Sequence, residues 1–375
     1  MPENRIKQRI LVAMSGGVDS AVAAKLLLQD GHLVESVYVR TWEHEDDLLG
    51  DCPGAKDLRD AEMVSDRLKI KFHVVNFVDF YNREIVQPMV NGYADGITPN
   101  PDILCNKQMK FGALMDYAKE NGFEALATGH YCIQKFNNSN EPELWEGADK
   151  NKDQSYFLAR LSANQLSYAR FPLGKFKKPE IRMLAQEAEL PVADKKDSQG
   201  ICFLGKVKVP DFLSHFIEDN PGEIVDKSGQ KLGTHMGLHR YTLGQRRGIG
   251  VPSNTDHEKY VVTGKDENKN QLIVAFDRNE ESTLWSNKFG LNQVSFLVPQ
   301  FNEMQEVSLL GKARYRDPST PIKLRKNEPN QWTVEFEDSQ RALTPGQVLA
   351  FYVGEQLVGS GIYSHSNLGR AALSS

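Results

Sequence analysis

The chain has 375 residues, of which 40% are hydrophobic and 25% charged, a composition typical of a folded protein with two or three domains. No apolar run approaches the roughly 20 residues that span a bilayer, and the polar start shows no signal-peptide pattern, so we expect a cytoplasmic protein without a membrane segment. A net charge of −5 argues against an indiscriminate nucleic-acid binder, and 4 cysteines are too few for a disulfide framework.

The first 130 residues alternate strand and helix patterns. Short apolar strands are predicted at residues 9–14, 33–39, 72–77 and 125–128, and amphipathic helices at 19–29, 58–68 and 111–118. Strands that alternate with crossover helices predict an α/β fold with a doubly wound parallel sheet.

The remaining chain changes character twice. A hairpin at 131–147, helices at 156–168 and 179–189 and a loop at 192–205 complete a first domain, which we place at residues 1–205. A helix at 210–217 and short strands between turn clusters predict a small central α/β linker domain at 206–280. Period-two alternation then predicts a C-terminal β-barrel at 281–375, with Val307, Leu309 and Tyr315 on one strand face and Trp332 and Val334 on another.

A glycine-containing loop follows the first strand. Ser15-Gly16-Gly17-Val18-Asp19-Ser20 stands where the strand ends and a helix begins, so its N–H groups and the helix dipole can hold a phosphate. It has no lysine and is shorter than the Gly-x-x-x-x-Gly-Lys-Ser/Thr loop of the other large class of ATP-binding proteins. The alternative is a plain strand-to-helix turn with Asp19 as N-cap.

Two cysteines lie in polar segments. Cys105 follows Asp102 by three residues after a proline-bracketed stretch, and Cys202 lies in a glycine-containing loop, so we expect both on loops. One such thiol can carry sulfur as a persulfide and the other can release it, ending in a disulfide. Lys107 and the pair Lys195-Lys196 would favour the thiolates. The alternative, a small buried hydrophobe, is our interpretation for Cys52 and Cys132. With no Cys-x-x-Cys pair, we expect no zinc ligands.

Charge is unevenly distributed along the chain. Residues 40–102 are rich in acids, whereas 170–208 and 312–326 are rich in Lys and Arg. Two phosphate-facing patches on an acidic protein would explain this pattern, and ordinary solvated faces would explain it equally well.

The loop at Ser15–Ser20 resembles the signature of the PP-loop ATP pyrophosphatases. Further motifs follow in the order typical of bacterial and mitochondrial tRNA-specific 2-thiouridylases, and the resemblance covers nearly the whole chain. They are Asn100-Pro101-Asp102-Ile103-Leu104-Cys105-Asn106, Ala127-Thr128-Gly129-His130-Tyr131, Asn151-Lys152-Asp153-Gln154-Ser155-Tyr156-Phe157, Lys196-Asp197-Ser198-Gln199-Gly200-Ile201-Cys202-Phe203, Thr242-Leu243-Gly244-Gln245-Arg246-Arg247-Gly248 and Thr344-Pro345-Gly346-Gln347.

The resemblance implies a role for each matching position. Cys202 would receive the persulfide, Cys105 would free the sulfur, and Asp102 would act as acid or base. The positions around ATP would be Ala13, Met14, Ser15, Gly16, Gly17, Val18, Asp19, Ser20, Val39 and Gly129. Those that contact the target base or tRNA would be Asn100, Pro101, Asp102, His130, Lys152, Asp153, Gln154, Arg314, Tyr315 and Gln347. Val39 departs from the methionine typical of the family.

The resemblance also implies a reaction. ATP, with Mg²⁺ across its phosphates, would adenylate the C2 oxygen of the wobble uridine of tRNAs for Lys, Glu and Gln. The protein would grip these tRNAs by the backbone of the anticodon arm. Sulfur from a persulfide relay protein, a cysteine desulfurase or a carrier, would then displace AMP. Several local alternatives remain: His130 as a sheet cap, Lys152-Asp153-Gln154 as a helix cap, and Arg314 with Tyr315 as a solvated mid-strand face. The rival functions are another PP-loop ligase and a catalytically silent RNA-binding protein.

Overall fold

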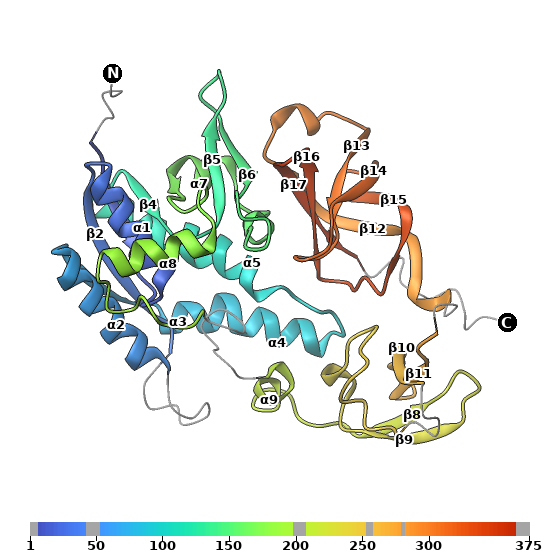
Figure 1. The fold of residues 1–375 in the computed structure, drawn as a ribbon. Coiled ribbons are helices and arrows are strands. Elements are labelled where there is room, and N and C mark those ends of the chain that lie inside the picture. The colour runs from blue at the N-terminus through green and yellow to red at the C-terminus, as the bar shows by residue number, and fades with distance from the viewer. Residues whose placement is uncertain (1–6, 43–52, 198–207, 253–257, 279–281, 365–375) are drawn as a thin grey trace. The chain divides into compact units, whose positions relative to one another are not determined.

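The computed structural model describes residues 7–42, 53–197, 208–252, 258–278 and 282–364 (Figure 1). The chain divides into two compact units, each built from separate stretches of sequence. Unit one consists of Met1–Gln87, Pro101–Val207 and Val353–Gly359. Unit two consists of Pro88–Asn100, Lys208–Tyr352 and Ser360–Ser375.

Unit one is built on a five-stranded parallel sheet, as the sequence predicted. Its strands, in the order β3-β2-β1-β4-β7, are β1 (Arg9–Ala13), β2 (Leu33–Arg40), β3 (Phe72–Asn76), β4 (Ala125–Ala127) and β7 (Ala169–Arg170). β1 and β4 are apolar on both faces and almost fully buried, which is typical of a central parallel strand. β7 was not predicted, because two residues are too few to carry a pattern.

Helices cover both faces of this sheet. They are α1 (Val18–Gln29), α2 (Pro53–Leu68), α3 (Val78–Tyr81), α5 (Pro101–Cys105), α6 (Leu114–Glu120), α7 (Ala163–Tyr168) and α8 (Lys178–Glu187), with the π-helical segments η2 (Asn82–Val86) and η3 (Asn106–Ala113) and the 3₁₀ turn η4 (Ser155–Leu158). The helix predicted at 156–168 is therefore a 3₁₀ turn followed by a short helix. α1 and α8 pack together (Figure 1), and Val22 of α1 and Ala185 of α8 both belong to the main core.

The strand order reverses between β1 and β4. The chain runs outward from β1 to β2 and β3, and the next parallel strand, β4, lies on the opposite side of β1. The carboxyl ends of β1 and β4 therefore flank a topological switch point, where open α/β sheets bind their ligands.

A hairpin leaves the sheet after β4, as predicted. Its strands are β5 (Cys132–Phe136) and β6 (Pro142–Glu146). The outer edge of β6 pairs with the start of β17 (Gln356–Tyr363), where Gln356 lies opposite Trp145 and Leu357 opposite Leu144. Unit one thus includes a strand from near the end of the chain.

Unit two contains two β-structures. The central one has the order β10-β11-β8-β9, with β8 (Gly222–Val225), β9 (Lys231–His235), β10 (Tyr260–Asp266) and β11 (Gln271–Phe276). The helix α9 (Val209–Leu213) precedes β8, and the 3₁₀ turn η5 (Leu238–Arg240) lies between β9 and β10 in the chain. Ile224, Val262 and Leu272 form its core. Unit two also holds all of α4 (Gln87–Ala94) except its first residue.

The second β-structure is the predicted C-terminal barrel. It consists of β12 (Trp285–Phe296), β13 (Glu306–Lys312), β14 (Thr320–Glu328), β15 (Gln331–Arg341), β16 (Val348–Val353) and the end of β17, with 3₁₀ turns η6 (Ser282–Leu284) and η7 (Pro299–Phe301). A pairing between β12 and β17 closes the barrel. Trp332, Val334 and Phe336 of β15 all point into its core, as their alternation predicted.

Candidate functional site

The loop after β1 has a fixed backbone shape. Gly16 has φ +74°, and a Cβ there would lie 2.3 Å from the carbonyl oxygen of Asp57, so only glycine fits. Ser15 and Ser20 lie within hydrogen-bond distance of each other, 3.2 Å between hydroxyls, and Ser20 donates to the Gly17 carbonyl. Gly17, not Asp19, is the N-cap of α1, so the alternative of Asp19 as N-cap is wrong.

The loop after β4 lies directly against this first loop. A Cβ on Gly129 would come within 2.9 Å of the Asp19 carbonyl carbon and the Ser20 nitrogen. Val39 is buried near the end of β2, which pairs with β1. The positions predicted to bind ATP, from Ala13 to Ser20 with Val39 and Gly129, therefore gather at the carboxyl ends of three adjacent strands.

Asp19 faces inward from the first turn of α1. Its carboxylate accepts a 2.6 Å hydrogen bond from the Tyr131 hydroxyl and two, of 2.8 and 2.9 Å, from the Lys178 ammonium. Burial, followed by the charge of Asp19, raises the pKa of Tyr131, which therefore stays protonated. Sequence reasoning missed both partners, because Lys178 comes 159 residues after Asp19.

Lys178 also contacts Asp197, the last described residue before the Cys202 segment. The Lys178 ammonium lies 2.8 Å from Asp197, which Arg182 at 2.7 Å and Lys152 at 2.9 Å also contact. Burial would raise the pKa of Asp197, but the hydrogen bonds and charges of Lys152 and Lys178 outweigh it and lower the pKa to about 2. Asp197 is therefore an anion in a cage of three cations. Cys202, like Cys52, lies outside the described residues.

Lys195 contacts the Ser15–Ser20 loop, the phosphate loop, from outside. Its ammonium donates to the Gly16 carbonyl at 2.9 Å and pairs with Asp57 at 2.7 Å and with Asp60. Burial lowers the pKa of Lys195, but the hydrogen bonds to these two carboxylates outweigh it and raise the pKa. This ammonium is therefore engaged at the loop, whereas the sequence suggested a role in activating a thiol.

Cys105 lies on a helix, and the expectation of a loop was wrong. Pro101 starts α5, because proline fits the first turn of a helix, and Cys105 ends it. The thiol is fully buried, with 0% exposure. Asp102 is three residues earlier and so shares a helix face with Cys105. The structure thus places the predicted pair side by side but shields the thiol from solvent.

Asp153 and Gln154 are used to build the base of the hairpin. The Asp153 carboxylate is buried and accepts hydrogen bonds from the Gly147 nitrogen and from the nitrogen and hydroxyl of Ser155. Gln154 forms two hydrogen bonds with the backbone of Tyr131. The Lys152 side chain, by contrast, is 40% exposed.

His130 is buried beside the switch point. Its Nδ1 lies 2.7 Å from the Thr128 hydroxyl, and its ring packs edge-on or tilted against Phe111 and Phe171. Burial, and then the nearby charge of Lys110, hold the pKa of His130 well below its usual value. The imidazole is therefore neutral at physiological pH.

In unit two, the Thr344–Gln347 motif holds the segment that leads to Asn100. The Gln347 amide donates to the Thr98 carbonyl at 2.7 Å, and the Thr98 nitrogen donates to the Pro345 carbonyl at 2.9 Å. Gly346 has φ +87°, and a Cβ there would press on the Thr98 carbonyl at 3.1 Å. The Thr344–Gln347 motif therefore meets the segment just before Asn100 within this unit.

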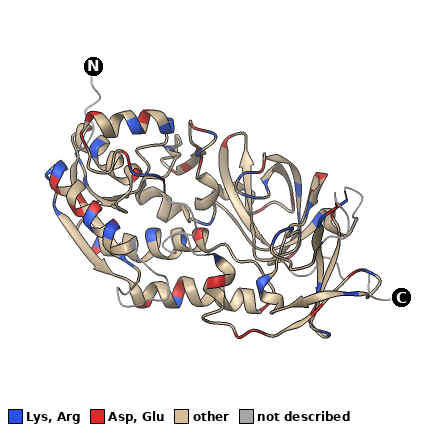
Figure 2. Cartoon of the chain, turned by 60° about the horizontal axis from the view of Figure 1, so that its bottom comes forward, with Lys and Arg blue, Asp and Glu red and all other residues tan. Residues whose placement is uncertain are grey.

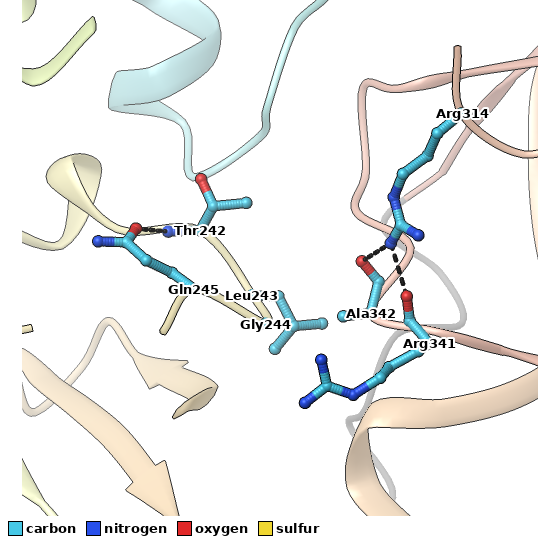
Figure 3. A pocket seen from close by; sticks show the side chains of 7 residues that line it. All are labelled: Thr242, Leu243, Gly244, Gln245, Arg314, Arg341 and Ala342. Carbon is cyan, nitrogen blue, oxygen red and sulfur yellow. Dashed lines mark hydrogen bonds between the residues drawn. The ribbon is translucent and has the colours of Figure 1, made fainter. Parts of the chain in front are cut away.

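Arg314 and Tyr315 lie in the turn after β13, which ends at Lys312, so the mid-strand placement was wrong. Alternation continued past the strand end because Ala313 is still buried. Arg314 donates to the carbonyls of Arg341 and Ala342 at the edge of a cavity of about 440 Å³ (Figure 3). The remaining lining residues, Thr242, Leu243, Gly244 and Gln245, come from the motif to which no role was given.

Several cations of the basic segments pair with nearby acids. In unit one Lys178, Arg182 and Lys195 all pair with carboxylates. In unit two Lys323 and Arg325 share Glu306. Figure 2 shows acidic and basic positions interspersed along the helices and strands. Among the described residues, no three His, Cys, Asp or Glu side chains form a metal-binding group, and no helix has the length and apolarity to cross a bilayer.

Comparison with protein-family models gives three consecutive matches. They are a tRNA methyl transferase HUP domain at residues 8–206, a tRNA methyl transferase PRC-barrel domain at 210–276 and an aminomethyltransferase beta-barrel domain at 286–363.

Curated relatives match over nearly the whole chain. A tRNA-specific 2-thiouridylase of Akkermansia muciniphila is 43% identical over 95% of this chain and 98% of its own. Proteins of the same name from Pseudomonas fluorescens, covering 96% of both chains, and from Acinetobacter baumannii, covering 96% of this chain and 98% of its own, are each 40% identical. Among solved structures, an NMN synthetase of Francisella tularensis is 17% identical over 52% of this chain and 67% of its own, but a TM-score of 0.32 carries no argument.

Proposed function

The chain belongs to the tRNA-specific 2-thiouridylase family, and on that premise we propose that it uses ATP to replace the C2 oxygen of the wobble uridine of tRNA with sulfur. The observation that carries this proposal is the phosphate loop at the switch point, where Gly16 and Gly129 allow close backbone packing. It offers backbone N–H groups and a helix N-terminus to the phosphates of ATP. The family-model descriptions mention methyl transfer, but this loop is suited to phosphate and thus to adenylation.

The first step is adenylation. The uridine C2 oxygen attacks the α-phosphorus of ATP and pyrophosphate leaves, so that a poor leaving group becomes AMP. Ala13–Ser20 and Gly129 would hold the phosphates, and Val39 would lie beside the adenine. Mg²⁺ would be held chiefly by the phosphates of ATP, because both oxygens of the nearby Asp19 carboxylate already accept from Lys178. When bound, it would offset phosphate charge.

The second step is sulfur transfer. The terminal sulfur of a persulfide on Cys202 adds to C2, the C2–O bond breaks, and AMP leaves with the oxygen. The Cys105 thiolate then attacks Sγ of Cys202, which breaks the S–S bond and yields 2-thiouridine and a Cys105–Cys202 disulfide. A dithiol must reduce this disulfide before the next cycle. Asp102, on the same face of α5, would take or give the proton.

Burial of Cys105 implies a conformational step. A thiol with 0% exposure cannot meet an incoming persulfide in the state described. We therefore expect tRNA binding to open the region around α5 and deliver Cys202 to it.

The tRNA would be held by both units. In unit one Lys152 is suited to a backbone phosphate, whereas His130, Asp153 and Gln154 would act mainly by shaping the surface. Arg314 and Tyr315 in unit two would meet RNA from the turn after β13, and Gln347 would set the position of Asn100 and, through it, of Pro101 and Asp102.

The partners and boundaries follow the same proposal. We expect the anticodon arm of tRNAs for Lys, Glu and Gln, a cysteine desulfurase or carrier as persulfide donor, and a cytoplasmic location. The domains would be a catalytic domain at 1–205, a central domain at 206–280 and a barrel at 281–375, boundaries supported by the family-model ranges.

Reconstitution tests the proposal. Full-length protein is incubated with unmodified tRNA, ATP, and a cysteine desulfurase with cysteine, and nucleosides are analysed by mass spectrometry. We expect 2-thiouridine at the wobble position and one AMP per sulfur. Turnover of ATP on another acceptor without 2-thiouridine would favour a different PP-loop ligase, and no ATP turnover at all would favour a silent RNA-binding protein.

A further inference from the structure

Lys178 joins the phosphate loop to the chain that leads to Cys202 through two carboxylates, whereas Lys195 of that chain reaches only the Gly16 carbonyl of the loop. Its ammonium lies 2.8 Å from Asp19, in the first turn of α1, and 2.8 Å from Asp197, five residues before Cys202. We propose that Lys178 is a positioning residue that keeps the Cys202 segment in register with the ATP site, so that sulfur reaches uridine while it is still adenylated. This inference rests on the proposed function.

The ammonium is well placed to act as a fixed bridge. Only 13% of the Lys178 side chain is exposed, so its ion pairs with the two carboxylates are less screened than surface pairs. The backbone is fixed as well, because the Lys178 nitrogen donates to Asp149 at 2.9 Å and Ile181, one turn later, is in the main core. The Lys178 backbone therefore keeps its place at the start of α8, from where the side chain reaches both carboxylates.

The other members of the cluster reach only one end of the bridge. Arg182 and Lys152 pair with Asp197, and Tyr131 donates to Asp19. Without Lys178, Asp19 would lose its cation and the link to Asp197, whereas Arg182 and Lys152 would still pair with Asp197. Loss of the bridge would therefore unlink Asp197 from Asp19 and the ATP site, while Arg182 keeps Asp197 on α8.

The phosphate loop does not depend on this bridge for its shape. Its hydrogen bonds run between Ser15, Ser20 and Gly17, and Lys195 supports it from outside. We therefore expect adenylation to survive the loss of Lys178 while sulfur transfer slows. Adenylated uridine that waits for sulfur is attacked by water, which returns uridine and releases AMP.

The test is the ratio of AMP released to 2-thiouridine formed, at saturating ATP and tRNA, with a cysteine desulfurase and cysteine as the sulfur source. For Lys178→Met we expect the ratio to rise by about tenfold or more, with AMP release within about threefold of wild type. Asp197→Asn should raise the ratio in the same way, and the double variant should be no worse than either single one. Lys178→Arg should restore most of the coupling.

Lys150 offers a matched control. It also pairs with two carboxylates of unit one, Glu146 at 2.9 Å and Glu355 at 2.8 Å, but touches neither end of the bridge. Lys150→Met should leave the ratio unchanged. Thermal melting of each variant shows whether it is folded, and Asp197→Asn tests the bridge from its exposed end if Lys178→Met is not.

Three results would overturn the inference. An unchanged ratio in Lys178→Met and Asp197→Asn would mean that the bridge couples nothing. An equal fall in AMP release and thiolation would make Lys178 part of the ATP site alone. Additive effects in the double variant would mean that the two residues act separately. If wild type itself forms no 2-thiouridine, it is the proposed function that fails.

Discussion

The phosphate loop and the cluster around Asp197 lie in the same unit but are held in different ways. The loop is fixed by backbone geometry, with Gly16 and Gly129 packed so closely that a methyl group would clash. The cluster is held by side chains alone, as Lys152, Lys178 and Arg182 converge on one carboxylate. A backbone packed this closely has one conformation, whereas a charged side chain can leave one ion pair and form another. The loop is therefore rigid, and the cluster, which lies shortly before Cys202 in the sequence, is adjustable.

Loss of the Cys105 thiol should give the largest effect, because it removes the chemistry and leaves both regions in place. We expect Cys105→Ser to lower 2-thiouridine formation by about 1,000-fold or more, with ATP binding unchanged by calorimetry. Cys132→Ala is the control, since Cys132 is equally buried, and it should keep thiolation within about twofold of wild type while costing about 1–2 kcal/mol of stability. Thiolation at the wild-type rate by Cys105→Ser would refute the sulfur-release step.

Gly16→Ala should break the rigid region. The new methyl group would meet the Asp57 carbonyl at 2.3 Å, and φ is +74°. We expect about 100-fold slower AMP release and a loss of about 2–4 kcal/mol in the free energy of unfolding. Gly31→Ala separates strain from clash, because its φ is +86° but nothing lies within 4 Å. It should cost only about 1 kcal/mol and leave AMP release intact. Equal effects of the two variants would show that the clash is irrelevant.

Asp153→Ala and Lys152→Ala should distinguish a residue that shapes the RNA-binding surface from one that contacts RNA. Removing this buried carboxylate leaves the Gly147 nitrogen and the Ser155 nitrogen and hydroxyl without their acceptor, so we expect a loss of about 3 kcal/mol in urea denaturation. Lys152→Ala should change stability by less than about 0.5 kcal/mol and instead weaken tRNA binding, lowering its salt dependence by about one phosphate contact. If Lys152→Ala lowers stability and Asp153→Ala weakens tRNA binding alone, Lys152 is the shaping residue and Asp153 the one that contacts RNA.

The smallest effect concerns the pH dependence of the adjustable cluster. Asp197 has its pKa lowered from 3.8 to about 2, so its contribution to stability is complete above pH 3.8 and is lost as the pH falls toward 2. Because a third of its side chain is exposed, solvent screening limits this contribution to about 1 kcal/mol or less. Urea midpoints of wild type and Asp197→Asn should therefore differ at pH 6 and converge near pH 2. A difference that persists at pH 2 would contradict the ion-pair account.

Local patterns in the sequence were enough to predict the parallel sheet, the hairpin, the barrel and the phosphate loop, because each depends on a local period or a glycine turn. Cys105 was misplaced because Pro101 was interpreted as part of a loop, although proline is equally at home at a helix start. Arg314 was misplaced because burial of Ala313 extends the alternation beyond the strand. Lys178 and Asp19, 159 residues apart, meet only through tertiary folding, for which the sequence offers no local signal.

The strand pairing at β6 has a consequence during synthesis on the ribosome. Trp145 and Leu144 find their partners only when Gln356 and Leu357 emerge, about two hundred residues later. At about 5–20 residues per second, this edge stays open for roughly 10–40 seconds of translation. An open edge is a template for pairing with other chains. A fragment that stops at residue 205 would never close it, so the N-terminal unit needs the end of the chain to be complete.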